Sequence, residues 1–129
     1  MKSKISLAFE NCRKEKRPAL LTYTVAGDNN KKNSLEILKS IASFVDIVEI
    51  GIPHNTPVAD GGQIQNSAYR AIKNGIRIKD IFQIVKKFKK NKVNRPVILM
   101  GYYNNIYQQG ENSFLQQCKK SGVDGLIVV

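Results

Sequence analysis

Two carboxylates stand out in the sequence because of the residues that surround them. Glu49 lies within an apolar run, residues 45–50 (VDIVEI), and Asp60 lies in the following loop, just before two glycines. The run is too continuously apolar for a half-solvated strand and short enough for a buried strand of a parallel sheet. A carboxylate at the end of such a strand costs stability unless it is paired or has a chemical role. We therefore expect the chemistry of this protein in residues 45–65.

Glu49 fits a role in proton transfer. No basic residue lies near it in the sequence, and its neighbours Val48 and Ile50 are apolar. Burial raises the pKa of a carboxyl group, because it disfavours the charged form. A carboxyl group with a raised pKa can act as general acid and as general base. The alternative is that Glu49 is a structural partner of a distant cation.

The hydrophobic pattern predicts alternating helices and strands. Strands are expected at residues 19–26, 45–51, 96–103 and 123–129. Helices are expected at residues 3–15, 33–42, 64–73, 78–90 and 111–120. The second helix is predicted to start with a capping box formed by Asn33 and Glu36, and the last to bury Phe114, Leu115 and Cys118.

This alternation predicts a parallel sheet with right-handed crossovers. A (β/α)8 barrel, the TIM barrel, needs about 250 residues, and the chain supplies 129 residues and four apolar strands. We therefore expect residues 1–129 to be the N-terminal half of a single TIM-barrel domain, cut after its fourth strand. An open flavodoxin-like sheet is the alternative, because periodicity alone does not distinguish the two.

In a barrel, ligands bind at the carboxyl ends of the strands. The polar residues expected there are Thr24, Asp28, Glu49, Asp60, Tyr102 and Asn104. Asp28 is also explained by a turn, and the tyrosines by packing. His54 is the one histidine, so no second imidazole is present to complete a metal site.

The bulk composition limits the possible partners. The net charge is +11, but the lysines are dispersed apart from residues 86–92 (KKFKKNK), and no nucleic-acid-binding motif accompanies them. Cys12 and Cys118 lie too far apart in the sequence to suggest a zinc site or a disulfide framework. No apolar run approaches the ~20 residues that span a bilayer. We expect a soluble, cytoplasmic protein that binds neither nucleic acid nor membrane.

The sequence resembles the tryptophan synthase alpha subunit. The resemblance rests on the spacing of Glu49, Gly51, Pro53, Pro57, Ala59, Asp60, Gly61, Ile64 and Gln65. Further support comes from residues 23–28, from residues 100–104 (MGYYN) and from residues 122–124 (GVD). The resemblance extends over essentially the whole chain.

The resemblance implies a TIM-barrel lyase that cleaves indole-3-glycerol phosphate to indole and glyceraldehyde 3-phosphate, in tryptophan biosynthesis. It implies that Glu49 moves protons at indole C3, that Asp60 binds the indole N–H, and that no cofactor is held in this chain. The positions that match the lining of the indole pocket are Tyr23, Met100, Tyr102, Ile127 and Val129.

The resemblance also implies a partner. The family forms an α2β2 heterotetramer with a beta subunit that carries pyridoxal phosphate (PLP), and Pro53 and Asn104 match positions on that interface. Residues 54–56 (HNT) stand where the family usually has Phe-Ser-Asp, and Gly62 replaces a usual proline. The contact with the beta subunit is the part of the resemblance that these departures affect.

Two other functions remain compatible with the sequence. The family's phosphate-binding loops lie in the second half of the barrel, so we expect residues 1–129 alone to be inactive. The chain could then be a non-catalytic α/β binding or interaction module. It could also belong to another sugar-phosphate TIM-barrel enzyme.

Overall fold

The computed structural model describes residues 2–93 and 95–129. Its four strands form one parallel sheet in the order β1-β2-β3-β4. The strands are β1 (Leu21–Val25), β2 (Ile47–Gly51), β3 (Val97–Gly101) and β4 (Gly125–Val128). Each strand is rich in β-branched or other apolar residues, as the sequence predicted.

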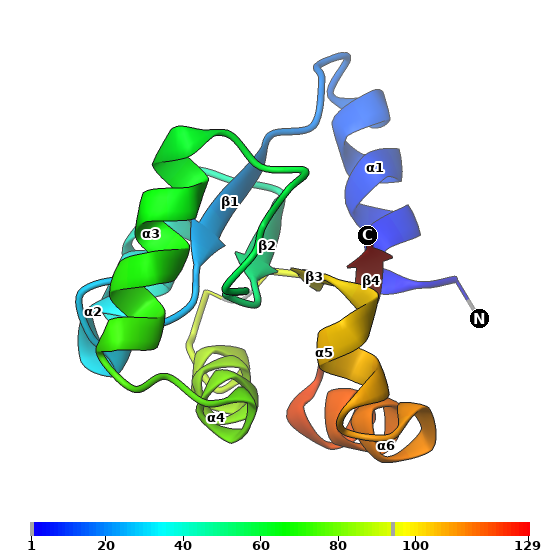
Figure 1. Ribbon diagram of the computed structural model, residues 1–129. Helices are drawn as coiled ribbons and strands as arrows, with labels where there is room; N and C mark the ends of the chain where they lie inside the picture. Colours follow the sequence, from blue (N-terminus) through cyan, green and yellow to red (C-terminus); the bar gives the residue numbers. More distant parts are fainter. Residues whose placement is uncertain (1, 94) are drawn as a thin grey trace.

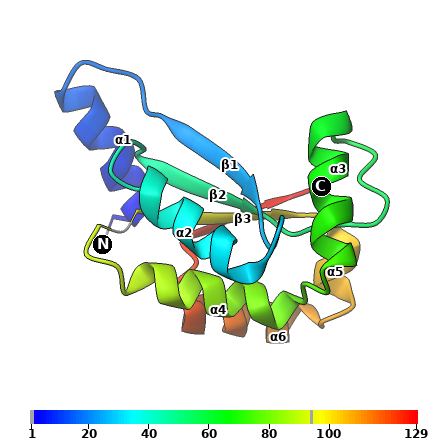
Figure 2. The ribbon, with the colours of Figure 1, turned by 90° about the vertical axis from the view of Figure 1, so that its left-hand side faces the viewer.

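Six helices connect or flank these strands in the described part of the chain. They are α1 (Lys4–Lys14), α2 (Lys31–Ile41), α3 (Gly62–Lys73), α4 (Ile78–Lys89), α5 (Tyr103–Tyr107) and α6 (Glu111–Ser121). Helices α2, α4 and α6 lie side by side along one face of the sheet, whereas α1 lies near the start of the strands and α3 near their carboxyl ends (Figures 1 and 2).

The strand order distinguishes the two predicted architectures. In a flavodoxin-like sheet the first strand lies between its successors, with the order 2-1-3-4-5, and helices cover both faces. Here each strand pairs with the next one in the chain, and the crossover helices α2, α4 and α6 share one face. This is the winding of a (β/α)8 barrel, of which the chain shows four strands. The predicted fold is confirmed, and the flavodoxin-like alternative is wrong.

The hydrophobic core lies between the sheet and its crossover helices. Val48 and Ile50 of β2 and Leu99 of β3 pack against Leu38 of α2 and Phe88 of α4, and all five are at most 1 % exposed. Side chains alternate between the two faces of a strand. Glu49, which stands between Val48 and Ile50, therefore points to the opposite, inner face of the sheet.

Two aspartates fix the strands at their amino ends. Asp46 accepts two hydrogen bonds from the guanidinium of Arg17, at 2.7 and 2.8 Å, and one from the backbone N–H of Leu20. Asp124 binds the ammonium group of Lys89 and the backbone N–H of Val97. Each aspartate thus joins segments that are distant in sequence, at the end of the sheet away from Asp60.

Three local predictions were wrong. Helix α2 starts at Lys31, because the side chain of Asn30, not Asn33, accepts the capping hydrogen bond from the N–H of Asn33. Strand β3 ends at Gly101, and the residues after Tyr102 form α5, which the sequence analysis missed. Leu115 of α6 is 51 % exposed and does not face the core.

The location of the core gives a matched test of stability. We expect Leu38→Ala to lower the free energy of unfolding by about 2–5 kcal/mol, because Leu38 is fully buried and its removal leaves a cavity. The same change at the exposed Leu115 should alter it by less than about 0.5 kcal/mol. Urea unfolding followed by circular dichroism measures both. Equal losses in the two variants would contradict this description of the core.

Candidate active site

Glu49 is an unpaired carboxyl group on the inner face of the sheet. Its position in β2 is aligned with Tyr23 of β1 on one side and with Ile98 of β3 on the other. The side chain is half-buried and forms no hydrogen bond or ion pair with the residues that the structure describes. Burial raises the pKa of Glu49 above its usual value, as the sequence analysis predicted. The group is therefore suited to hold a proton and to transfer it.

Tyr23 lies close to both carboxylates. Burial raises its pKa to about 12, and the charges of Asp60 and Glu49 add to this effect. The phenol also lies against the backbone of β2 at Gly51, where an added Cβ would come within 2.5 Å of the ring carbon Cζ. A residue larger than glycine at position 51 would displace Tyr23 from the site. At neutral pH the hydroxyl of Tyr23 stays protonated.

Asp60 is held at the carboxyl ends of the strands by a tyrosine. The hydroxyl of Tyr102 donates a hydrogen bond to Oδ2 of Asp60 at 3.0 Å and accepts one from the backbone N–H of Ala59 at 3.0 Å. Gln65 of α3 also donates to the backbone carbonyl of Asp60 at 2.8 Å. Tyr102 is itself buried, at 8 % exposure. Unlike Glu49, Asp60 therefore has a hydrogen-bond donor for its carboxylate.

Asp28 joins the loop after β1 to α3. Its carboxylate accepts a turn-type hydrogen bond from the N–H of Asn29, at 2.9 Å, and two hydrogen bonds from Arg70, at 2.7 and 2.8 Å. Binding to Arg70 holds the pKa of Asp28 below its usual value. Asp28 is thus more than the turn residue that the sequence suggested, since it ties α3 to the site.

The remaining predicted pocket residues belong to β3, β4 and the residue after β4. Met100 is aligned with Ile127 in the sheet, and Ile127 and Val129 are 42 % and 47 % exposed. The carbonyl of Val129 accepts a hydrogen bond from the N–H of Tyr103 at 2.9 Å. Alternation along the strands puts the side chains of Met100 and Ile127 on the same face as Glu49.

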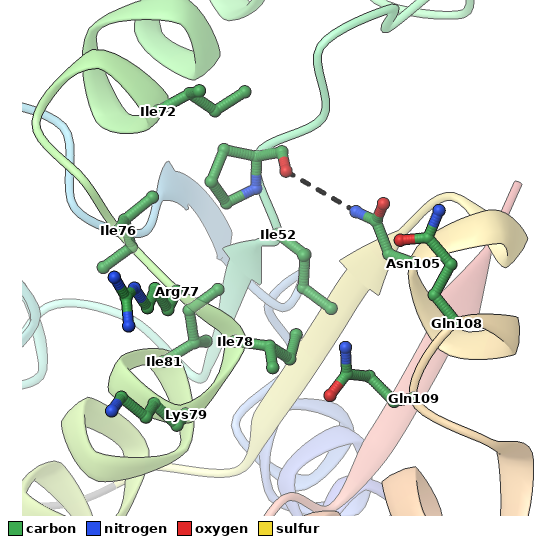
Figure 3. Close-up of a pocket in the computed structure, with 11 residues that line it drawn as sticks. Ile52, Ile72, Ile76, Arg77, Ile78, Lys79, Ile81, Asn105, Gln108 and Gln109 are labelled. Atoms are coloured by element: carbon green, nitrogen blue, oxygen red, sulfur yellow. Dashed lines mark hydrogen bonds between the residues drawn. The ribbon is translucent and has the colours of Figure 1, made fainter.

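The two predicted interface residues lie outside this inner face. Asn104 is exposed on α5, and Pro53 begins the loop after β2. The carbonyl of Pro53 accepts a long hydrogen bond, at 3.5 Å, from the side-chain amide of Asn105. Pro53 and Asn105 also line a cavity of about 480 Å³ with the apolar residues Ile52, Ile72, Ile76, Ile78 and Ile81 (Figure 3).

Neither Glu49 nor Asp60 lines this cavity, because it lies on the helical side of the sheet. A smaller cavity, of about 220 Å³, is lined by Tyr23 and by Asp28 at the carboxyl end of β1. Tyr23 thus connects the inner face to the smaller cavity, whereas Glu49 and Asp60 line neither of the two cavities.

His54 makes two contacts that could not be predicted from the amino-acid sequence. Its ring stacks on that of Tyr102, with centroids 4.7 Å apart and an interplanar angle of 19°. Its Nδ1 lies 3.0 Å from Oδ1 of Asn105. From the sequence, His54 was weighed as a metal ligand and as part of the altered loop 54–56, and Asn105 was given no role. The described residues contain no group of three or more histidine, cysteine or acidic side chains that could hold a metal ion.

No helix in the described part of the chain is long and apolar enough to cross a membrane. The lysines of residues 86–92 lie at the end of α4 and beyond it, where positive charge also complements the helix dipole.

Comparisons with known proteins agree with this geometry. A family model described as "Tryptophan synthase alpha chain" matches residues 9–129. The tryptophan synthase alpha chain of Pelagibacter ubique (strain HTCC1062) is 73 % identical over 127 residues, which are 98 % of this chain and 48 % of the relative. That of Pyrococcus furiosus is 44 % identical over 111 residues, 86 % of this chain and 44 % of the relative.

Solved structures give the same result. The crystal structure of tryptophan synthase subunit alpha from Legionella pneumophila str. Paris superposes with a TM-score of 0.93 at 34 % identity. The match covers 100 % of this chain and 50 % of that structure. The chain therefore spans about half the length of the relatives that it matches.

The surroundings of Glu49 predict how stability depends on pH. The pKa of Glu49 in the folded protein lies above its usual 4.5, so the folded state keeps this proton to a higher pH than the unfolded chain does. Stability therefore falls as the pH rises from below 4.5 through the raised pKa, and ionised Glu49 is destabilising at neutral pH. We expect Glu49→Gln to be more stable than the wild type at neutral pH, with the gain vanishing in acid.

Urea unfolding at several pH values measures this difference. Glu36→Gln is the matched control, because Glu36 lies on the surface of α2 and its side chain is 55 % exposed. A pH-independent gain in Glu49→Gln, or the same profile in both variants, would contradict the raised pKa.

Proposed function

Because the chain belongs to the tryptophan synthase alpha chain family, we propose that it contributes to the cleavage of indole-3-glycerol phosphate into indole and glyceraldehyde 3-phosphate. One observation carries the proposal. An unpaired carboxyl group of raised pKa, Glu49, lies on the inner face of the sheet, near a second carboxylate, Asp60, whose surroundings are different. Two carboxyl groups in contrasting environments can take different roles in one site.

Glu49 is proposed to carry the proton in both directions. Its carboxylic acid protonates C3 of the indole ring, which leaves a positive charge on the ring. The carboxylate then takes the proton from the hydroxyl group on the carbon attached to C3. The bond between this carbon and C3 breaks, and its electron pair returns to the ring and neutralises it. Indole and the aldehyde are formed, and Glu49 is protonated again, so the step needs no further reactant.

Asp60 is proposed to bind the indole N–H. The positive charge that develops on protonation at C3 is shared with the ring nitrogen, and an ionised carboxylate beside it stabilises the transition state. The hydrogen bond from Tyr102 supports this role, because it fixes one oxygen of Asp60 and leaves the other free to accept from substrate. Tyr23, Met100, Tyr102, Ile127 and Val129 are proposed to border the ring, which their positions around the inner face support.

The proposed activity is that of a complete alpha chain. Residues 1–129 supply the carboxyl groups and part of the apolar wall, and the site for the substrate's phosphate is assigned to the part of the relatives that this chain does not span. We propose that residues 1–129 are the N-terminal half of one barrel domain. The complete chain is proposed to act in the cytoplasm, without a cofactor of its own.

A beta subunit that carries PLP is the proposed partner, in an α2β2 assembly. Pro53 and Asn104 are proposed to lie on the interface, which is supported by the exposure of Asn104 and by the position of Pro53 beside a cavity open to the outside. The substituted residues 54–56 lie in the same loop as Pro53, so they are proposed to alter the strength of the subunit contact.

The proposal is tested by replacing Glu49 in a complete alpha chain that carries residues 1–129. We expect Glu49→Gln to lower the rate of indole release by at least about 10²–10⁴-fold, the usual contribution of general acid–base catalysis. Glutamine has nearly the same shape and cannot transfer the proton. Indole formation is followed by absorbance or by chromatography.

Glu36→Gln again serves as the control and should keep the wild-type rate, since Glu36 lies on the surface of α2. The unfolding experiment above shows whether Glu49→Gln remains folded. Unchanged turnover in a folded Glu49→Gln enzyme would refute the proposed role.

A further inference from the structure

His54 contacts the same tyrosine that binds Asp60. The loop between β2 and α3 meets Tyr102 at two points: the ring of His54 covers its face, and the N–H of Ala59 donates to its hydroxyl. Between these points the loop is exposed, with Val58 at 81 %. The loop is thus held to the barrel at Tyr102, and Asp60 directly follows the second contact.

The tautomer of His54 follows from its partner. The side-chain nitrogen of Asn105 donates toward the carbonyl of Pro53, so its oxygen Oδ1 faces Nδ1 of His54, 3.0 Å away. An amide oxygen only accepts, and therefore Nδ1 of His54 carries the proton. Asn105 thereby binds two successive residues of the loop, and this fixes the plane of the imidazole over Tyr102.

The direction of the Tyr102 hydroxyl follows in turn. The hydroxyl oxygen accepts from Ala59, and its single proton is directed to Oδ2 of Asp60. The hydroxyl oxygen lies on the axis of ring rotation, so both bonds break only when the whole side chain of Tyr102 is displaced. The stacked imidazole blocks such a displacement from one side. The separation of 4.7 Å lies within the range of about 4.5–7 Å in which aromatic rings attract each other. The orientation of Asp60 therefore depends on His54, although the two side chains do not bind each other.

We propose that His54 is a positioning residue for Asp60, which acts through Tyr102 and is held in place by Asn105. The role of Asp60 in this inference rests on the proposed function. The contacts among His54, Asn105, Tyr102 and Asp60 do not depend on it. It accounts for an aromatic ring at position 54, and it assigns to Asn105 the role of fixing that ring.

The contact is tested first by NMR, independently of activity. The chain has one histidine, so the Hε1 resonance of His54 needs no assignment among several. In a stacked pair the ring current of Tyr102 displaces this resonance, and we expect Tyr102→Leu to move it toward the position found in the unfolded chain. Tyr107→Leu is the control, because Tyr107 is 67 % exposed and pairs with Tyr103. No change in Tyr102→Leu, or equal changes in both, would overturn the inference.

The effect on Asp60 is tested by kinetics in a complete alpha chain that carries residues 1–129. We expect His54→Ala to lower kcat about tenfold and to change KM by less than about threefold, because a misplaced Asp60 weakens stabilisation of the transition state. His54→Phe keeps an aromatic ring over Tyr102 and should recover most of the lost kcat. Asn55→Ala is the control, since Asn55 is exposed and its side chain accepts a hydrogen bond from the neighbouring Thr56.

The outcomes separate the two proposals. An active wild type in which His54→Ala equals Asn55→Ala overturns the positioning role and leaves the proposed function intact. An equal loss in His54→Ala and His54→Phe also overturns it, because the ring then does not act by stacking. A wild type that releases no indole refutes the proposed function, and the NMR comparison then decides alone whether His54 holds Tyr102.

Discussion

The alternation of side chains along β2 is the constraint on which the rest of this structure depends. Val48 and Ile50 are fully buried against the crossover helices, and this anchors the register of the strand. Glu49 lies between them and is forced onto the inner face, where it has no cation or hydrogen-bond donor among the described residues. A shift of one residue would bury the carboxylate among the apolar side chains and expose the isoleucine and valine. The core therefore determines where the carboxyl group stands, and the burial there determines its raised pKa.

Much of this arrangement could be predicted from the sequence, because it depends on local patterns. Apolar runs rich in β-branched residues indicated the four strands, and the burial of Glu49 followed from its neighbours. Helix α5 was missed because five residues are too few to show a helical period. Leu115 was placed in the core because α6 has apolar residues on adjacent positions, and only the packing of α4 against α6 selects Phe114 and Cys118. The side-chain pairs could not be predicted, because their members are distant in the sequence. Asp28 and Arg70 are 42 residues apart, and His54 and Asn105 are 51 apart.

The loop after β2 shows how such distant pairs create the site. Pro53 and Pro57 restrict its backbone, but neither fixes where Asp60 points. That direction is determined by Tyr102, which follows a different strand. Arg70 and Asp28 hold α3, which follows Asp60, beside the carboxyl end of β1. The surroundings of Asp60 are thus built by residues of the loop after β1, of α3 and of the segment after β3. The site depends on the parallel sheet, because the sheet brings these segments to one edge.

Tyr23 is a second residue of the inner face that could be considered as the proton carrier. It lies near both carboxylates, and a tyrosine can in principle act as an acid or base. Its pKa of about 12, however, keeps the phenol protonated at neutral pH, and its position against Gly51 leaves little freedom to move. The hydroxyl can donate a hydrogen bond there but is a poor carrier of protons. The carboxylate of Asp60 is bound by the hydroxyl of Tyr102, whereas that of Glu49 is unpaired among the described residues. Glu49 therefore combines an unpaired carboxyl group with a raised pKa, and these surroundings favour holding a proton and releasing it.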